Sequence, residues 1–508
     1  MEINIKNESL PVTGCICRTE NKFTAECDVI VPDSKPDILK ILQLSARPRI
    51  SNREMKNGRI TVTGTVSFSI IYLADDEEKS IKSITSSCEF SNVIRDDSIG
   101  DNMLSFVDVD VCDLNCSVIN CRKITLHTSL CMAVKIYSCF ELNLISDIEG
   151  ACTKTKKLSS SVICAHAEDH SLLTDSFSLS PGKLPVCEIL KSDAAISERE
   201  IKIIDDKAII KGNLRITVLY KTESGLEYAQ SEIPFAHILQ ADGIREDMDY
   251  DYCVKVLDIN ADATENTDGQ MCIIDFSADL FFRVIARSTY SVNCVTDAFL
   301  PHGNLECGQA TVSVDSMESN LQRSIDVREK ITLPENFPDI SSVYQVVLHP
   351  VTENCSVDGE MLRVSGYTEV YILYLSNDSE SPVYSYKTNI DFSSSFESPG
   401  CMITPVSDSV LRSLSYTINS EKCVEVRATI DVSVQCIKTT ETETVYSAEQ
   451  KEYIPVKRPS IIVSCMGNNR SLWDIAKEYS VSPQSILAAN AFESENDLTS
   501  HMALIIPK

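Results

Sequence analysis

Apolar and polar residues alternate along much of the chain. Between Ile60 and Ile70 (ITVTGTVSFSI), apolar or small residues occupy every second position, with threonine or serine between them. The same period of two recurs between Leu214 and Tyr220. This period is typical of an antiparallel strand with one buried face, and helical periodicity is scarce before residue 470. The pattern therefore predicts a mainly β protein.

The alternating segment occurs three times, as GRITVTGTVSFSIIY (58–72), DKAIIKGNLRITVLY (206–220) and EMLRVSGYTEVYILY (360–374). In each copy a glycine precedes a tyrosine by eight residues, and the pairs are Gly64 and Tyr72, Gly212 and Tyr220, and Gly366 and Tyr374. A glycine inside a strand costs packing, so its recurrence predicts a β-bulge or the close approach of another backbone. We interpret these glycines and tyrosines as structural residues.

The outer two copies share a second motif, VPDSKPDI (31–38) and LPENFPDI (333–340), at the same offset of 302 residues that separates their glycines. The nearest counterpart in the middle copy is LPVCEIL (184–190), so we interpret that copy as shortened. We expect three tandem β-sandwich-like repeats, over 1–150, 180–300 and 320–450. Asp37 and Asp339 follow a proline in the shared motif, and each is either a turn cap or part of an acidic loop that faces a partner.

Helical spacing is found near the end of the chain. Leu472, Ile475, Ala476 and Tyr479 recur at i, i+3, i+4 and i+7 after Ser471, a residue suited to an N-cap. A second short helix is predicted after Ser482, and apolar strands are predicted at 461–466 and 504–507. The segment 458–508 is therefore expected to form a small βααβ module. Its Trp473, the single tryptophan of the chain, is interpreted as a core anchor, with a ligand-stacking role as the alternative.

Composition limits the possible partners. The 508 residues include 74 Asp and Glu against 46 Lys and Arg, a formal net charge of -28. Such a surface repels phosphate backbones and anionic headgroups, so we expect neither nucleic-acid binding nor direct membrane insertion. The chain shows no secretory signal pattern and no apolar window long enough for a spanning helix, which predicts a cytosolic location. The 21 cysteines, an odd and scattered set, are expected to be reduced and mostly buried.

No catalytic or metal site is expected. Cys112, Cys116, Cys121 and Cys131 lie close in sequence but lack the paired spacing of structural zinc sites, so we interpret them as strand thiols. HAEDH (166–170) lacks the glutamate that directly follows the first histidine in a metalloprotease helix. Phosphate-loop, dinucleotide-binding and nucleophile-elbow motifs are absent from the sequence. The prediction is a protein that is not an enzyme and needs no cofactor.

VIVPDSKPDI (29–38), the glycine-to-tyrosine strand and the TDAFLP connector (296–301) resemble the SPOCS-type (DUF3794-like) repeats of spore-coat morphogenetic proteins from endospore-forming Firmicutes. SLWDIAKEYSVSPQSILAANAF (471–492) resembles a LysM module. Three repeats followed by one LysM module is similar to a clostridial coat protein that partners the ATP-hydrolysing scaffold of the coat basement layer. The resemblance implies a non-catalytic adaptor that tethers this ATPase to the forespore surface through its LysM module and has other coat proteins as further partners. The adaptor is expected in the mother-cell cytosol, from which it is recruited to the forespore surface and spore coat.

The LysM resemblance is incomplete in two loops that flank the sugar groove of glycan-binding modules. Asn469 and Arg470 replace the usual Gly-Asp, and His501 and Met502 replace the usual Gly-Gln. These departures favour a protein ligand, although a peptidoglycan-binding wall or cortex protein remains the alternative. The residues predicted to form the partner face are Asn469, Arg470, Ser471, Asn490, His501 and Met502.

Overall fold

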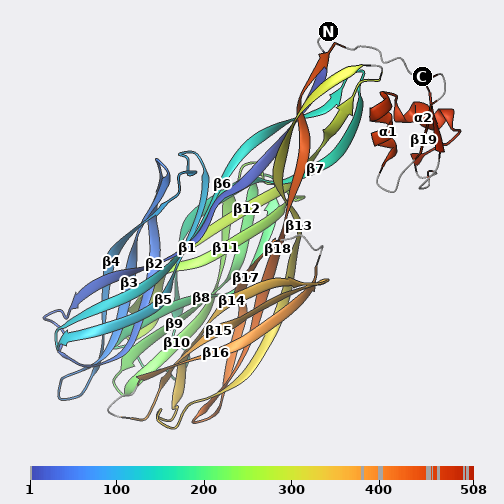
Figure 1. The fold of residues 1–508 in the computed structure, drawn as a ribbon. Helices are drawn as coiled ribbons and strands as arrows, with labels where there is room; N and C mark the ends of the chain where they lie inside the picture. Colours follow the sequence, from blue (N-terminus) through green and yellow to red (C-terminus); the bar gives the residue numbers. More distant parts are fainter. Residues whose placement is uncertain are drawn as a thin grey trace.

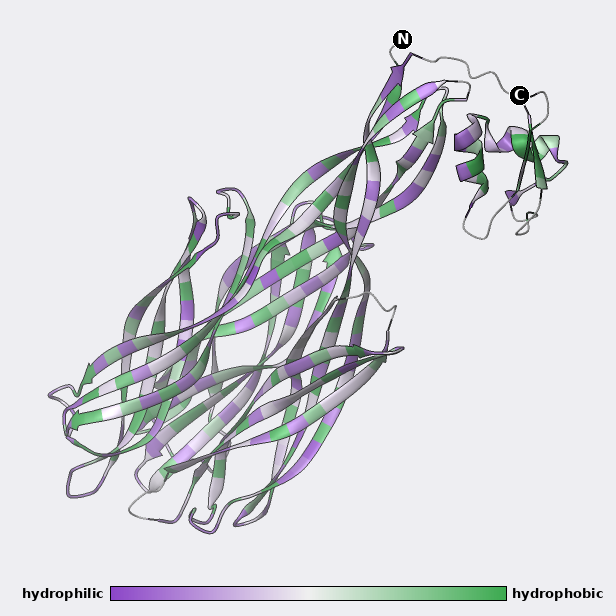
Figure 2. Ribbon diagram, viewed as in Figure 1, coloured by the Kyte–Doolittle hydropathy of each residue, from purple (hydrophilic) through white to green (hydrophobic). Residues whose placement is uncertain are grey.

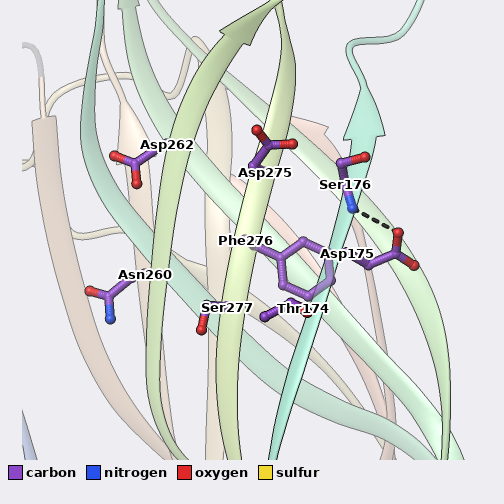
Figure 3. A pocket seen from close by; sticks show the side chains of 8 residues that line it. All are labelled: Thr174, Asp175, Ser176, Asn260, Asp262, Asp275, Phe276 and Ser277. Carbon is purple, nitrogen blue, oxygen red and sulfur yellow. Dashed lines mark hydrogen bonds between the residues drawn. The ribbon is translucent and has the colours of Figure 1, made fainter.

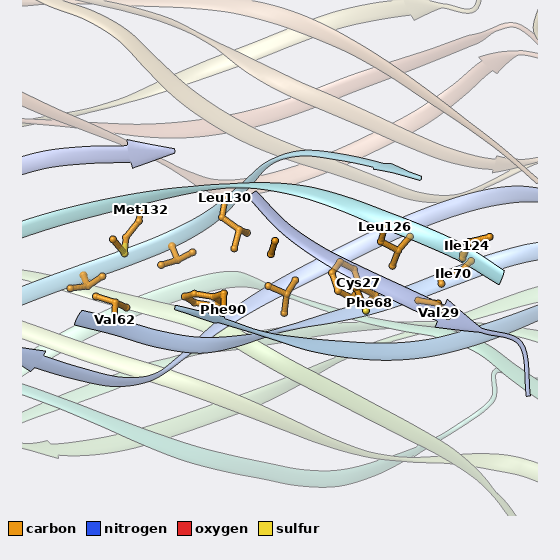
Figure 4. Close-up of a cluster of buried hydrophobic side chains, with 14 of the residues drawn as sticks. Cys27, Val29, Val62, Phe68, Ile70, Phe90, Ile124, Leu126, Leu130 and Met132 are labelled. Atoms are coloured by element: carbon orange, nitrogen blue, oxygen red, sulfur yellow. The ribbon is translucent and has the colours of Figure 1, made fainter. Parts of the chain in front are cut away.

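The structure is a computed structural model that describes residues 3–301, 303–378, 383–398, 404–452, 459, 462–465, 470–495, 498 and 503–507. The first unit contains six antiparallel strands in two three-stranded sheets, ordered β1-β6-β5 and β2-β3-β4. Its core lies between the two sheets, where side chains of β1, β3, β4 and β6 meet (Figure 4). The strands are β1 (Ile5–Ile30), β2 (Ile38–Met55), β3 (Arg59–Ala74), β4 (Ile81–Arg95), β5 (Leu104–Asn120) and β6 (Lys123–Ile148).

The second and third units repeat this topology. Their sheets are ordered β7-β12-β11 and β8-β9-β10 in the second unit, and β13-β18-β17 and β14-β15-β16 in the third. The second unit is built from β7 (Cys152–Ser178), β8 (Glu188–Ile204), β9 (Lys207–Thr222), β10 (Gly225–Gln240), β11 (Asp249–Glu265) and β12 (Met271–Phe299). The third is built from β13 (Asn304–Thr332), β14 (Ser342–Asp358), β15 (Met361–Leu375), β16 (Val383–Glu397), β17 (Thr404–Ser420) and β18 (Cys423–Lys451).

The prediction of a mainly β chain is confirmed, and its origin is the alternation described above. Hydrophobic and hydrophilic residues alternate along the strands (Figure 2). In β3 the side chains at Ile60, Val62, Val66, Phe68 and Ile70 are buried, while the threonines and serines that alternate with this buried face are partly exposed. Each strand therefore gives one face to a core and one to solvent or to another unit.

The second unit is complete rather than shortened. It has all six strands, and its first strand begins at Cys152, well before residue 180, where the sequence motif placed the boundary. The sequence motif is less complete in this unit because Leu184, Pro185 and Val186 replace the residues that correspond to Pro36, Asp37 and Ile38 of the first unit. The difference between the copies is one of loop residues and not of strand number.

The three units pack into one body with a narrow stem, which forms the upper part of the molecule in Figure 1. The stem is made by the paired ends of β1 and β6, β7 and β12, and β13 and β18. Two apolar clusters fill it, and each draws on all three units. Their buried members are Leu10, Val12, Leu144, Leu158, Cys294 and Val314 in one cluster, and Ile145, Ile148, Val295, Ala298 and Val445 in the other.

A third shared cluster, here called the central cluster, joins the β2-β3-β4 sheet of the first unit to the corresponding sheets of the other two. Equivalent residues of the three units meet in it, such as Ile71 of β3, Leu219 of β9 and Leu373 of β15. The body is thus held together at two levels, at the stem and at the central cluster.

The expectation that every cysteine is reduced is wrong at one pair. Cys112 and Cys131 form a disulfide between β5 and β6, with their Cα atoms 5.9 Å apart. Cys112 is the extra residue of a β-bulge between Val111 and Asp113, and this bulge brings it beside Cys131 on the next strand. The other described cysteines are free. Among the described residues, no helix is long and apolar enough to cross a membrane.

Candidate interaction site of the terminal module

The last described elements form a small module beside the stem (Figure 1). It contains β19 (Ile462–Cys465), α1 (Leu472–Tyr479), α2 (Pro483–Ala489) and β20 (Ala503–Ile506), and β19 pairs with β20 in antiparallel fashion. The apolar side of α1 packs with α2 and β20 in one cluster. The buried residues of the module in this cluster are Leu472, Ile475, Ala476, Val481, Ile486, Leu504 and Ile506.

The start of α1 is closed by a capping box. The Ser471 hydroxyl accepts a hydrogen bond from the backbone N–H of Asp474, and the Asp474 carboxylate accepts one from the backbone N–H of Ser471. The bonds that the Asp474 carboxylate accepts from the backbone N–H and the hydroxyl of Ser471 hold the pKa of this carboxyl below its usual value. Because this carboxylate already occupies the positive end of the helix, the helix start is a poor site for an acidic partner group. Ser471, one of the residues predicted for the partner face, is thus used as the N-cap of α1.

Two other residues of the predicted partner face also have internal contacts. The Arg470 guanidinium forms an ion pair with Glu478 of α1. The Asn490 amide donates to the carbonyls of Ile486 and Ile505, at 2.8 and 2.7 Å, and accepts from the N–H of Ile505 at 2.8 Å. Asn490 therefore ties the end of α2 to β20. The remaining predicted residues, Asn469, His501 and Met502, lie outside the described residues.

Trp473 packs against the body of the protein as well as against its own module. Its ring makes an edge-on contact with Phe299 at the end of β12, with the ring centroids 5.1 Å apart. Its indole N–H donates to the Asp297 carboxylate at 2.8 Å, and the Lys477 ammonium contacts the two oxygens of the same carboxylate at 2.6 and 2.9 Å. Trp473 is half-buried, and it packs on the apolar cluster of its module as well as on the end of β12. Sequence reasoning missed Asp297, Phe299 and Lys477 because each belongs to an ordinary strand or helix pattern.

The recurring tyrosines close the ends of the sandwiches. Tyr72, Tyr220 and Tyr374 are fully buried. The Tyr72 hydroxyl donates to the carbonyl of Pro36 at 3.0 Å, and Tyr374 makes the equivalent bond to Pro338 at 3.1 Å. Burial raises the pKa of Tyr72 to about 12, so this phenol stays protonated and keeps donating at any physiological pH. In the second unit the Tyr220 hydroxyl donates instead to Glu227, at 3.3 Å.

The aspartates of the two outer motifs are bound to a hairpin of their own unit. Asp37 accepts a hydrogen bond from Arg122, and Asp339 forms an ion pair with Lys422 at 3.0 Å. Arg122 and Lys422 lie in the turns that join β5 to β6 and β17 to β18. These aspartates therefore fasten the loop that precedes β2 or β14 to the turn of another hairpin in the same unit.

One open depression of about 460 Å³ lies on the second unit, across β7, β11 and β12. Its acidic side chains do not converge on a common point (Figure 3). Asp262 and Asp275 are paired across adjacent strands, and Asp175 accepts the backbone N–H of Ser176 at 2.8 Å. The full lining is Thr174, Asp175, Ser176, Asn260, Asp262, Asp275, Phe276 and Ser277. Within the described residues, no group of His, Cys, Asp or Glu side chains is arranged to hold a metal ion.

Three side chains on the first unit form a serine–histidine–glutamate chain that resembles a hydrolase triad. His127 lies between Ser117 and Glu26, with each ring nitrogen 3.2 Å from its neighbour. All three lie on the open outer face of the β1-β6-β5 sheet, where His127 and Glu26 are well exposed. Catalysis by such a triad needs oxyanion donors and a substrate cavity, and the described depression lies on another unit. The arrangement is best explained as a surface hydrogen-bond chain across three strands.

Comparison with known proteins identifies part of this architecture. A family model described as "SipL, SPOCS domain" matches residues 37–119 and 185–264. The two segments start at equivalent places and cover the middle strands of the first and second units, from β2 to β5 and from β8 to β11. The strands that build the stem lie outside them, as does the third unit, although it has the same topology. No curated protein and no solved structure matches this chain.

Proposed function

We propose that this protein is a non-catalytic adaptor in endospore coat assembly. The observation that carries the proposal is the match of the SipL-type SPOCS domain at two equivalent places in a body of three like units. A body of this kind offers extended sheet surfaces and a stem, which suits the binding of other coat proteins. No converging catalytic group accompanies the open depression among the described residues.

The terminal module is the proposed contact with the morphogenetic ATPase of the coat basement layer. Its strand and helix order, with the helix that starts at Leu472, is the order expected of a LysM module. Val463 and Ile505 are paired across β19 and β20, and their side chains are 57% and 49% exposed. An exposed apolar pair of this kind is suited to a protein partner rather than to a sugar chain. The adaptor would be recruited from the mother-cell cytosol to the forespore surface through this contact.

Binding of the full-length chain to the purified coat ATPase and to purified peptidoglycan tests the proposal. We expect saturable binding to the ATPase, and loss of that binding when the chain is ended after Glu452. Replacing Arg470 with Glu should weaken ATPase binding by about 1–3 kcal/mol, because it removes a cation of the module and sets a carboxylate beside Glu478. Arg363→Glu on β15 of the third unit, which makes the same charge change at an exposed ion pair with Asp358, is the matched control.

Two results would contradict the proposal. Binding to peptidoglycan without binding to the ATPase would favour the wall or cortex protein instead. Equal ATPase affinity for the wild-type chain and the chain ended after Glu452 would remove the terminal module from the interface.

A further inference from the structure

Each unit contributes one pair of strand ends to the stem, and the tips of these three pairs are here called the stem ends. They occupy equivalent places in the three units but carry different side chains. At the position of Phe299 in the second unit, the first unit has Glu149 and the third has Glu449. The residue paired with Phe299 is Cys152, whereas Glu449 is paired with Glu306, and both of these glutamates are bound to Lys451. The second unit therefore presents an apolar pair where the third presents a network of ion pairs.

This apolar pair is where the terminal module sits. Phe299 is only 6% exposed, and both Phe299 and Cys152 belong to the same apolar cluster as the core of the module. Beside them, the Asp297 carboxylate receives the indole N–H of Trp473 and the ammonium of Lys477. Trp473 and Lys477 are one turn apart on α1, so one helix face supplies both the aromatic and the charged contact.

The charge pattern on the two sides is complementary. Asp297 of the stem faces Lys477 of the module, and Lys154, which is paired with Asp297 across the strands, attracts Asp474 of α1. In the third unit, the equivalents of Asp297 and Lys154 are Ser447 and Gly308. The third stem end therefore lacks both charges, and the first lacks the aromatic ring.

We propose that the second unit's stem end, formed by Cys152, Asp297 and Phe299, is a selective docking site for the Trp473 and Lys477 face of the chain's own terminal module. The length of chain between the two supports an occupant from the same molecule. β18 ends at Lys451 in the stem, and the residues from there to Ile462 can span at most about 40 Å. A tether this short gives the module a local concentration in the millimolar range, which favours it over a second copy.

This docking goes beyond the proposed function, because it does not depend on which outside partner the protein binds. It fixes the orientation of the module on the body. The face of α1 that carries Trp473 is turned to the stem, so the β19 and β20 pair and α2 are the parts left to other molecules. Because Trp473 packs against the stem, its ring is not available to stack on a sugar.

The single tryptophan makes the docking measurable in the full-length protein. Converting the site to the residues of the third unit, by Asp297→Ser together with Phe299→Glu, should expose Trp473. We expect a red shift of its emission and stronger quenching by acrylamide, with unchanged far-ultraviolet circular dichroism. Asp147→Ser, the same change at the first unit's stem end, should leave the emission as in the wild type. Identical emission and quenching in the double variant and the wild type would overturn the proposal.

A second measurement uses the wild-type protein and does not rely on a variant that folds. Because the Lys477 ammonium touches the Asp297 carboxylate, a zero-length carbodiimide reagent should join them as an amide, with loss of one water. An equal mixture of isotopically light and heavy chains should give the Lys477–Asp297 peptide pair only as light–light and heavy–heavy species. Light–heavy pairs would show that a second copy is the occupant, and the absence of the pair would show that the site is not used. Either result would overturn the proposal.

Discussion

Gly64, Gly212 and Gly366 occupy places where a side chain has no room. A Cβ atom at Gly64 would overlap the carbonyl oxygen of Arg49 on β2 and the ring of Phe90 on β4. Gly212 and Gly366 meet an equivalent carbonyl and an equivalent phenylalanine ring in their own units. The close approach of backbone that the repeated glycine predicts is thus a packing constraint repeated in every unit.

Replacing Gly64 with alanine should destabilise the protein by about 1–3 kcal/mol, because the strand or the Phe90 ring must shift to admit the methyl group. Chemical denaturation of the full-length chain measures this loss. Gly14→Ala is the control within a strand, since its added Cβ would meet only the edge of the Phe140 ring at 3.4 Å. Equal stability of the Gly64 and Gly14 variants would show that the close approach does not constrain this position.

Sequence reasoning at the residue scale succeeded where a constraint is repeated and failed where it occurs once. The glycine and tyrosine positions could be found because each appears three times at one spacing. The N-cap role expected of Ser471 is also confirmed, because it follows from the helical spacing after it. Asn490 could not be assigned, since a polar residue in a small module can face a partner or bind its own backbone. Asp297 lies in the TDAFLP motif, but the sequence does not indicate its contact with Lys477, because that contact depends on how two distant segments meet.

Single strands in this protein serve two separate cores. β6 contributes Leu126 and Leu130 to the sandwich of the first unit, and Ile145 and Ile148 to the stem. Its length of 26 residues makes this possible. Alternation predicts that such a segment is a strand. It does not indicate which part of the strand packs in the sandwich and which part packs in the stem. This is why the stem could not be predicted from the alternation.

The β5 strand also links the first unit to the second through an ion cluster. The Asp108 carboxylate accepts from Lys255 of β11 at 2.8 Å and from Arg283 of β12 at 2.9 Å, and its side chain is 30% exposed. Burial raises the pKa of Asp108, but the two cations lower it by more, so the net pKa lies below the ordinary value. The carboxylate is therefore better stabilised in the folded protein than in the unfolded chain.

This difference predicts a dependence of stability on pH. The contribution of Asp108 should be fully present well above the unfolded pKa of about 3.9, and it should be lost as the pH falls below that value toward the lowered folded pKa. Asp108→Asn should cost about 1–3 kcal/mol at pH 7, because it leaves Lys255 and Arg283 without their charged partner. The free energy of unfolding of both proteins should be measured from pH 7 down to pH 3.

Asp113→Asn is the control for this change. Asp113 lies on the same strand, is exposed, and accepts a hydrogen bond from Asn115 only two residues away. The stability difference between wild type and Asp108→Asn should shrink as the pH falls below about 4, while the Asp113 variant should follow the wild type throughout. A difference that stays constant across this range would mean that the charge of Asp108 is not what joins the units.

On the scale of the whole molecule, the repeats behave as three parts of one body. The same kind of hydrogen bond joins each unit to the one before it. The Thr13 hydroxyl of the first unit accepts from the backbone N–H of Ile163 in the second, and the Ser161 hydroxyl of the second accepts from the backbone N–H of Met317 in the third. The sequence predicts three units of one kind, and this follows from their shared spacing. Their close association could not be predicted, because residues such as Leu219 look like any other buried position of an alternating strand.

The shared central cluster leads to a prediction about cooperativity. Leu219 is fully buried, and it packs with Ile71 of the first unit and Leu373 of the third in that cluster. Leu219→Ala should cost about 2–5 kcal/mol, because the surrounding residues belong to three sheets that cannot all move in to fill the space. If the units unfold together, hydrogen exchange should accelerate in peptides from β3 and β15 as well as in those from β9.

Leu172→Ala, at a side chain that is 66% exposed on β7 of the same unit, is the control. It should change stability by less than about 0.5 kcal/mol and leave exchange unaltered. Faster exchange confined to the second unit would show that each unit is stable on its own, and that the clusters between units contribute little to holding the body together.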